Sequence, residues 1–265
     1  MPKSSSDRRH FIIAGVLVVI VTVLMDLLLK SALPMPVQAS IEALTIDRLI
    51  GWHLTVIAAL FSLVVVFMLY AMVVFRRREG DESEGEHFEG NYTLEIAWTV
   101  IPLILVVIFG YIGVVDLAEI TKKNEELTVK ATGVQWAWTF EYEGGVLSQE
   151  LVLPVDKRVR VLLRSNDVLH SFWVPEFRVK QDLLPAPAEP ESEEDAYPSS
   201  VYFTPNKVGE YEVKCAELCG LTHWNMLAGV KVVEQDQFTV WLQTELAKVN
   251  DGKAVAGAEM KATTP

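Results

Sequence analysis

The chain has 265 residues, of which 51 % are apolar, and its 35 acidic and 23 basic side chains leave a net charge of −12. This acidity argues against a nucleic-acid partner, which requires a basic surface. Three long apolar runs precede residue 117, which argues against a wholly soluble chain and predicts a membrane-anchored protein with one outer domain.

The first apolar run, Phe11–Leu29, follows two arginines, as the hydrophobic segment of a secretory signal peptide does. Val37-Gln38-Ala39 offers the small-residue cleavage site of such a peptide. The run is nevertheless long for a signal peptide, and Asp26 and Lys30 lie near its end. Residues 1–48 are therefore predicted to contain either a cleaved signal peptide or an extra transmembrane helix, followed by an outer linker.

Two further runs, Leu49–Phe75 and Ile96–Val115, contain no charged residue. Each is long enough to cross a membrane, since a spanning helix needs about 20 apolar residues. Three arginines, residues 76–78, follow the first of these runs, and the positive-inside rule places them in the cytoplasm. Residues 49–116 are therefore predicted to form two transmembrane helices with a short cytoplasmic loop, and the rest of the chain to lie outside.

After Asp116 the sequence changes to short segments in which apolar and polar residues alternate between Gly, Pro, Asn and Asp, a pattern typical of β-strands. These segments are 127–132, 136–142, 158–163, 200–204, 210–214 and 228–233. Many short strands with turns predict a β-sandwich or barrel over residues 117–249. Within it, residues 236–249 are predicted to form a helix that covers the outside of the domain.

Two segments of the outer part carry no strand pattern. Residues 184–199 contain four prolines and are predicted to form an exposed loop. Five acidic side chains belong to this loop: Glu189, Glu191, Glu193, Glu194 and Asp195. Residues 250–265 are rich in Ala, Gly, Lys and Thr and are predicted to form a flexible tail.

The residues that carry chemistry lie in Cys215-Ala-Glu-Leu-Cys219-Gly-Leu-Thr-His223-Trp-Asn-Met226. Two thiols, an imidazole and a thioether within one short segment form a soft donor set, which selects copper over calcium or magnesium. A thioether beside Cys and His is typical of electron-transfer copper sites, where it is a weak ligand. His170 is the only other histidine of the outer domain and is therefore the only candidate for a second imidazole.

Three other sites would use part of this donor set. A disulfide between Cys215 and Cys219 suits a domain outside the cytoplasm. A zinc site would use both histidines but would leave Met226 without a role, and a blue copper site needs only one cysteine. Two thiolates that bridge two coppers use the whole segment, and they spread one electron over both metals. We therefore expect a two-copper site.

With these motifs the chain resembles subunit II of haem-copper cytochrome c oxidases. Residues 215–226 match the CuA signature of that family, Cys-x-Glu-x-Cys-Gly-x-x-His-x-x-Met, and His170-Ser-Phe-Trp-Val-Pro175 matches the segment that gives the first histidine. The resemblance runs from about Trp52 to Leu242. It implies a transmembrane helical hairpin followed by a cupredoxin-like Greek-key barrel, on a multi-pass protein of a prokaryotic cell membrane.

The resemblance also assigns ligands to a binuclear copper centre. Cys215 and Cys219 would bridge both coppers, and His170 and Met226 would complete one of them. The second copper would be completed by His223 and by the backbone carbonyl of Glu217, whose carboxylate would help to hold a magnesium ion at the boundary with subunit I.

The implied function is that of an oxidase subunit. Cytochrome c or a similar donor would reduce the copper pair, and the electron would pass to the haems of subunit I. Oxygen would be reduced to water there, with proton pumping. Two other functions share part of the pattern: a quinol-oxidising subunit with a metal-free domain, which the intact ligand set argues against, and a nitric oxide or nitrous oxide reductase module, which shares the copper motif.

Two more residues gain a role only from the resemblance. Trp136 matches the aromatic residue that lies under the docking site and receives the electron from cytochrome c, although alternating aromatics such as those of residues 136–142 are otherwise typical of a core. Glu95 matches a carboxylate at the entrance of a proton channel, although a carboxylate at a helix N-terminus is also favoured by the helix dipole.

One segment departs from the family. Pro-Gly-Arg usually follows Lys-x-Asp, whereas Lys180-Gln-Asp182 is followed by Leu-Leu-Pro185 and the acidic loop. This departure puts in doubt the usual contacts of that arginine with the haem propionate and magnesium region, and it raises the question of a reshaped docking face.

Overall fold

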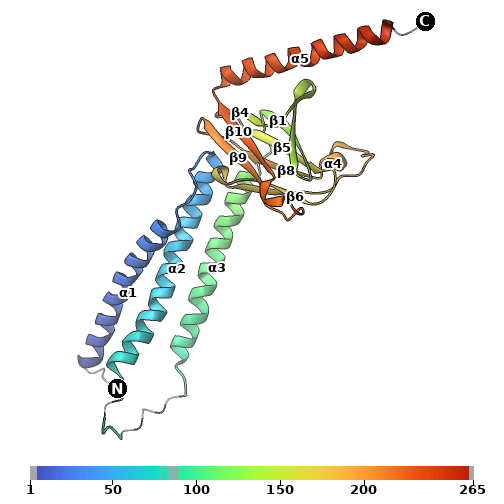
Figure 1. Cartoon of the computed structure of the whole chain (residues 1–265). Coiled ribbons are helices and arrows are strands. Elements are labelled where there is room, and N and C mark those ends of the chain that lie inside the picture. Colours follow the sequence, from blue (N-terminus) through green and yellow to red (C-terminus); the bar gives the residue numbers. More distant parts are fainter. Residues whose placement is uncertain (1–4, 78, 83, 85–86, 88, 263–265) are drawn as a thin grey trace. The chain divides into compact units, whose positions relative to one another are not determined.

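The computed structural model describes residues 5–77, 79–82, 84, 87 and 89–262 (Figure 1). The chain divides into two compact units. The helical unit comprises Met1–Met35 and Asp47–Val115, and the β unit comprises Pro36–Ile46 and Asp116–Pro265. The first turn of one long helix and the last turn of another therefore belong to the β unit.

Three helices are long and apolar enough to cross a membrane: α1 (Ser5–Ala32), α2 (Ile41–Val74) and α3 (Tyr92–Ile120). α2 and α3 correspond to the predicted hairpin. α2 begins eight residues before the uncharged run, at Ile41 rather than Leu49, because its first turns carry charged side chains that favour a helix but not a bilayer. α1 contains the run Phe11–Leu29, for which the sequence allows either a cleaved signal peptide or an extra transmembrane helix.

Polar side chains join α1 to α2 at two places within the helical unit. Asp26 accepts hydrogen bonds from Lys30 (2.7 Å) and from the hydroxyl of Thr55 (2.8 Å). Near the other end of α1, the His10 ring nitrogen lies 2.7 Å from the hydroxyl of Tyr70. Because ionised groups are costly in an apolar surrounding, this pairing lets α1 carry Asp26 and Lys30.

The β unit is built on two five-stranded sheets. One sheet has the order β3-β2-β1-β5-β8 and the other the order β4-β10-β9-β6-β7. The strands of the first are β1 (Leu127–Val134), β2 (Ala137–Tyr142), β3 (Val146–Ser148), β5 (Val159–Ser165) and β8 (Ser199–Phe203). Those of the second are β4 (Leu151–Pro154), β6 (His170–Val174), β7 (Val179–Leu183), β9 (Gly209–Cys215) and β10 (Leu227–Val233). The all-β prediction is confirmed.

The pairing within the sheets is mixed. β1 pairs with β5 and β4 pairs with β10 in parallel, and the other neighbours are antiparallel. The aromatic core includes Phe140, Phe172, Phe177 and Phe203, all with 0 % exposure. Each fully buried large side chain contributes about 1.5–3 kcal/mol, so this core is a main source of stability for the unit.

Two helices of the β unit differ from expectation. α5 spans Gln235–Ala262, so the helix predicted over 236–249 continues through most of the segment predicted to be a flexible tail. The Ala, Lys, Glu and Met residues of 253–262 have high helix propensity, which the tail prediction overlooked. Residues 263–265 lie outside the described residues. Within the predicted acidic loop, α4 (Glu193–Ala196) forms one short turn of helix capped by Ser192.

The linker Pro36–Ile46 is an integral part of the β unit. Glu42 accepts hydrogen bonds from the backbone N–H of Thr204 (2.7 Å) and from its hydroxyl (3.2 Å), and it forms an ion pair with Arg158. Arg158 also donates to the carbonyl of Ile120 at the end of α3 (2.5 Å). One arginine thus binds the beginning of α2 and the end of α3 to the sandwich, and both sides of its ion pair are almost fully buried.

Candidate metal centre

The metal-binding motif forms the turn of a β-hairpin. β9 ends at Cys215 and β10 begins at Leu227, and the two strands pair antiparallel with Leu227 opposite Lys214. The backbone N–H of Cys215 donates to the carbonyl of Met226 (3.1 Å), which closes the loop at its base. The first and last donors of the motif are therefore held together by the strand pairing itself.

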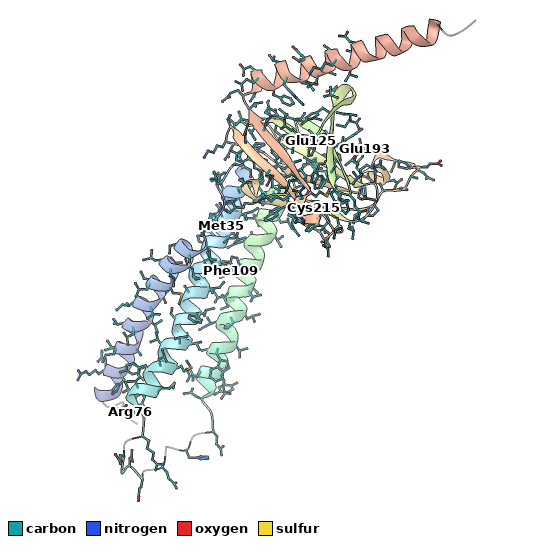
Figure 2. All side chains as sticks on the ribbon, in the orientation of Figure 1. Met35, Arg76, Phe109, Glu125, Glu193 and Cys215 are labelled. Carbon is teal, nitrogen blue, oxygen red and sulfur yellow. The ribbon has the colours of Figure 1, made fainter. Side chains whose placement is uncertain are left out.

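The donor atoms converge around the two cysteines, which are free and buried. The sulfur atoms of Cys215 and Cys219 are 3.7 Å apart, and the sulfur of Cys219 lies 3.6 Å from Nδ1 of His223 and 3.8 Å from Sδ of Met226. Figure 2 marks Cys215 among the packed side chains of the β unit. A thiol pair with this surrounding fits a metal site better than a disulfide.

His170 reaches the same site from the neighbouring strand. It is the first residue of β6, which pairs with β9 so that Phe172 lies opposite Cys215. Its Nδ1 lies 3.8 Å from the sulfur of Cys215, and ligand atoms of His170, Cys215 and Cys219 all lie within 4.8 Å of one another. The prediction that this histidine supplies the second imidazole is consistent with its fully buried position.

The backbone of the loop adds an oxygen atom that could be a metal ligand. The thiol of Cys215 lies 3.3 Å from the carbonyl oxygen of Glu217, to which it donates a hydrogen bond. The carbonyl of Met226 accepts a hydrogen bond from the indole N–H of Trp138 at 3.3 Å, which fixes the last residue of the loop against the core. Each of the six residues predicted as copper ligands therefore places a donor atom within 3.8 Å of the sulfur of Cys215 or Cys219.

The electrostatics of the site favour one thiolate. Burial raises the pKa of Cys215, but hydrogen bonds with His170 and with backbone groups outweigh it and lower this pKa to about 6. Burial and the neighbouring Cys215 raise the pKa of Cys219 to about 11. Burial lowers the pKa of His170, but hydrogen bonds with Cys215 and Asp167 outweigh it and raise this pKa. A cation that neutralises both thiolates would relieve their mutual repulsion.

The donors fit copper. Two thiolates, two imidazoles and a thioether are soft or intermediate ligands, and such a set selects copper or zinc over hard cations. A zinc site would leave the sulfur of Met226 unused, whereas that side chain is completely buried and its sulfur lies beside Cys219. The donor chemistry therefore agrees with the two-copper interpretation.

The aromatic segment divides between the core and the surface. Trp138, Phe140 and Tyr142 on β2 are buried, as expected for core aromatics. Trp136 was predicted to begin this strand, but it lies in the turn before β2 and is 37 % exposed. A Cβ placed on Gly220, next to Cys219, would lie 3.3 Å from the Trp136 ring. The indole thus lies on the metal-binding loop.

Two polar residues beside the site were not identified from the sequence. Asp167 lies 2.8 Å from Nε2 of His170, and Gln135 donates through Nε2 to the carbonyl of Cys219 at 2.6 Å. The position of Asp167, three residues before a candidate histidine ligand, was a usable signal, since ligand histidines commonly donate to a carboxylate. The contact of Gln135 joins residues far apart in sequence and leaves no local pattern.

Glu95 lies at the beginning of α3, in the helical unit. Its carboxylate accepts a hydrogen bond from the backbone N–H of Asn91 (3.2 Å), while the Asn91 side chain accepts from the N–H of Leu94 (3.2 Å). This reciprocal arrangement is that of a helix cap. The contacts of Glu95 within this chain are therefore structural, and its predicted proton role is not tested by them.

The chain matches known proteins over both units. The family model of the transmembrane domain of cytochrome c oxidase subunit II matches residues 28–114, and that of the periplasmic domain matches residues 145–233. Cytochrome c oxidase subunit 2 of Synechocystis sp. is 30 % identical over 258 residues, which cover 78 % of this chain and 74 % of the relative. The same subunit of Thermostichus vulcanus is 31 % identical over 262 residues, which cover 78 % and 77 %.

One solved structure is similar to about half of the chain. The periplasmic domain of subunit II of cytochrome oxidase from Bradyrhizobium japonicum is 31 % identical and covers 48 % of this chain and 97 % of its own, with a TM-score of 0.41.

Proposed function

Because the chain belongs to the cytochrome c oxidase subunit II family and is part of an oxidoreductase complex, we propose that its β unit accepts electrons from a cytochrome c at a CuA centre and passes them to a haem-bearing partner subunit. The proposal rests on two imidazoles, a thioether and a backbone carbonyl that each lie within 3.8 Å of one of two adjacent, buried cysteine sulfurs.

In this proposal Cys215 and Cys219 would be ligands of both coppers. His170 and Met226 would be further ligands of one copper, and His223 with the carbonyl of Glu217 would be those of the other. The copper pair supplies one-electron redox chemistry when it is bound. The protein contributes a ligand loop whose ends are fixed by strand pairing, so Cys215 and Met226 are held close together.

Further roles are proposed around this site. Trp136 would receive the electron from the donor, and its partial exposure and its packing against Gly220 support that role. The Glu217 carboxylate would share a magnesium ion with the partner subunit. Glu95 would admit protons to the partner, a role supported by its resemblance to the family segment. The β unit would lie on the outer side of a prokaryotic membrane.

The experiment that tests the proposal compares the wild-type chain with Cys219→Ser, Met226→Leu and the control Met35→Leu, whose methionine is in the helical unit and exposed. Copper is counted in the full-length chain purified in detergent without its partner subunit, and electron paramagnetic resonance shows whether one electron is shared by two copper nuclei. We expect two coppers and a shared electron in the wild type and in Met35→Leu.

The two site variants should differ from each other. Cys219→Ser removes a bridge and should abolish the shared-electron signal, whereas Met226→Leu removes only a weak ligand and should keep both coppers with an altered spectrum. One copper per wild-type chain with the spectrum of a blue copper protein would show that the proposed centre is wrong.

A further inference from the structure

The carboxylate of Asp167 is a junction between two parts of the site that are separate in sequence. Its Oδ1 lies 2.8 Å from Nε2 of His170, and it accepts from the backbone N–H of Val168 (2.7 Å) and the hydroxyl of Ser165 (3.2 Å). Its Oδ2 accepts from the backbone N–H of Gln135 at 2.7 Å. Both oxygens are therefore used, although the side chain is 30 % exposed.

The hydrogen bond between Gln135 and Asp167 fixes the turn that carries Trp136. Gln135 is bound to Asp167 through its backbone, and its side chain donates to the carbonyl of Cys219 at 2.6 Å. Gly220 leaves just enough room, since a Cβ there would lie 2.9 Å from Nε2 of Gln135. Gln135 thus binds the turn to a carboxylate beside His170 through its backbone and to the backbone of a cysteine ligand through its side chain.

We propose that Asp167 is a positioning residue which holds His170 and the Gln135–Trp136 turn as one hydrogen-bonded unit. The inference rests on the proposed function, because it concerns the geometry of the copper ligands and of the electron-accepting tryptophan. A proton held on Nε2 by Asp167 leaves the lone pair of Nδ1 directed at the cysteines. The same carboxylate prevents the turn from moving independently of the ligands.

Two simpler roles of Asp167 predict different behaviour. As a turn residue, it would serve only the local bonds to Ser165 and Val168, and its loss would lower stability alone. As a surface charge, it would attract a cationic donor without affecting the metal. Only a positioning role connects the spectrum of the bound copper with the rate of electron transfer through Trp136.

The test uses the full-length chain purified in detergent without its partner subunit, with Asp167→Ala, Asp167→Asn, Gln135→Ala and the control Glu189→Gln. The control removes one exposed negative charge of the same unit and touches none of these groups. Copper affinity is measured by titration against a chelator, the ligand geometry by electron paramagnetic resonance, and reduction rates are measured with a cytochrome c and with hydroquinone, a small neutral reductant.

For Asp167→Ala we expect roughly 10- to 100-fold weaker copper binding, the usual effect of losing a hydrogen-bond partner of a ligand histidine, together with a changed spectrum. Asp167→Asn keeps one acceptor oxygen and should give a smaller change of the same kind. Gln135→Ala should leave the His170 features of the spectrum intact and slow reduction by cytochrome c more than reduction by hydroquinone. Glu189→Gln should resemble the wild type in copper affinity and spectrum.

Each contrary result has a distinct meaning. If the wild type does not bind two coppers, the proposed function fails. If the wild type binds them and both Asp167 variants match Glu189→Gln in affinity and spectrum, Asp167 is only a turn residue or a surface charge and the inference is overturned. If Asp167→Ala does not fold, Asp167→Asn and Gln135→Ala decide: an unchanged spectrum in the first, or equal slowing with both reductants in the second, overturns the inference.

Discussion

Gly220 shows how much of the site depends on the absence of one side chain. Its φ of +123° lies in a region that is open almost only to glycine, and a Cβ there would come within 3.3 Å of the Trp136 ring. The loop between the two cysteines and His223 can therefore approach the aromatic turn closely. Gly220 has no metal-binding side chain. Its part in the motif is the backbone conformation and the close contact with Trp136 that it permits.

Gly220→Ala should displace Trp136 and slow reduction by cytochrome c, while the copper ligands stay in place. The matched control is Gly145→Ala, because Gly145 also has a positive φ of +83° but a Cβ there meets no atom within 4 Å. Both changes should cost about 1–3 kcal/mol of stability from backbone strain. Stopped-flow reduction and tryptophan fluorescence measure the difference, and equal rates in the two variants would contradict the proposed role of this contact.

At the scale of elements, Tyr142 joins β2 to β4 across the sandwich. Its hydroxyl donates to the carbonyl of Val152 (3.0 Å) and accepts from the N–H of the same residue (2.7 Å). Its ring packs against Trp241 of α5, with ring centroids 4.9 Å apart. The edge strand β4 is thereby fixed to the core, and α5 packs on the ring of Tyr142.

Tyr142→Phe should destabilise the β unit by about 1–3 kcal/mol, because both backbone groups of Val152 lose a buried partner. Tyr202→Phe is the control. The Tyr202 ring is 7 % exposed, and its hydroxyl has no hydrogen-bond partner in the described part of the chain. Loss of this hydroxyl should leave the stability of the β unit unchanged. Thermal unfolding followed by circular dichroism measures both, and equal melting temperatures would show that the Val152 bonds contribute nothing.

The same variant gives a pH dependence. Burial raises the pKa of Tyr142 above its ordinary value of 10.0. A raised folded-state pKa means that its contribution to stability is complete below about pH 10 and is lost as pH rises further. The stability difference between wild type and Tyr142→Phe should therefore shrink above pH 10, and a difference that grows there would contradict the burial of the phenol.

Whether a strand could be predicted from the sequence depended on whether buried and exposed residues alternate along it. β1 and β10 alternate between buried and less buried positions, and both were predicted from that alternation. β4 was missed because all four of its residues are buried, so no alternation exists to detect. In the site, the ligands share a motif, whereas Asp167 and Gln135 act through contacts made only by folding.

At the scale of the whole molecule, acidic side chains outnumber basic ones in the part of the chain that contains the copper site. From Leu117 onward the chain carries 23 acidic and 15 basic residues. The acidic loop, which Figure 2 marks at Glu193, is held at its base by Tyr197, whose ring lies 5.5 Å from the ammonium of Lys130 and 5.8 Å from the guanidinium of Arg164. Its carboxylates are exposed, so they contribute to the field that an approaching donor meets.

A chain in which Glu189, Glu191, Glu193 and Glu194 are changed to Gln should be reduced more slowly by a basic cytochrome c at low salt. Its rate should also depend less on salt than that of the wild type, because fewer charges steer the encounter. Reduction by hydroquinone, which carries no charge, should not change. Asp195 is left intact because its carboxylate accepts a hydrogen bond from the hydroxyl of Ser192, the cap of α4.

The control carries the same loss of charge in the loop between α2 and α3, as Glu79, Glu82, Glu84 and Glu89 changed to Gln. The positive-inside rule places that loop on the opposite side of the membrane from the donor. In that orientation the rate and salt dependence of the control should equal those of the wild type, since its charges would lie on the other side of the membrane from the encounter. An equal slowing in both variants would contradict the predicted orientation, and a wild-type rate without salt dependence would contradict acidic steering itself.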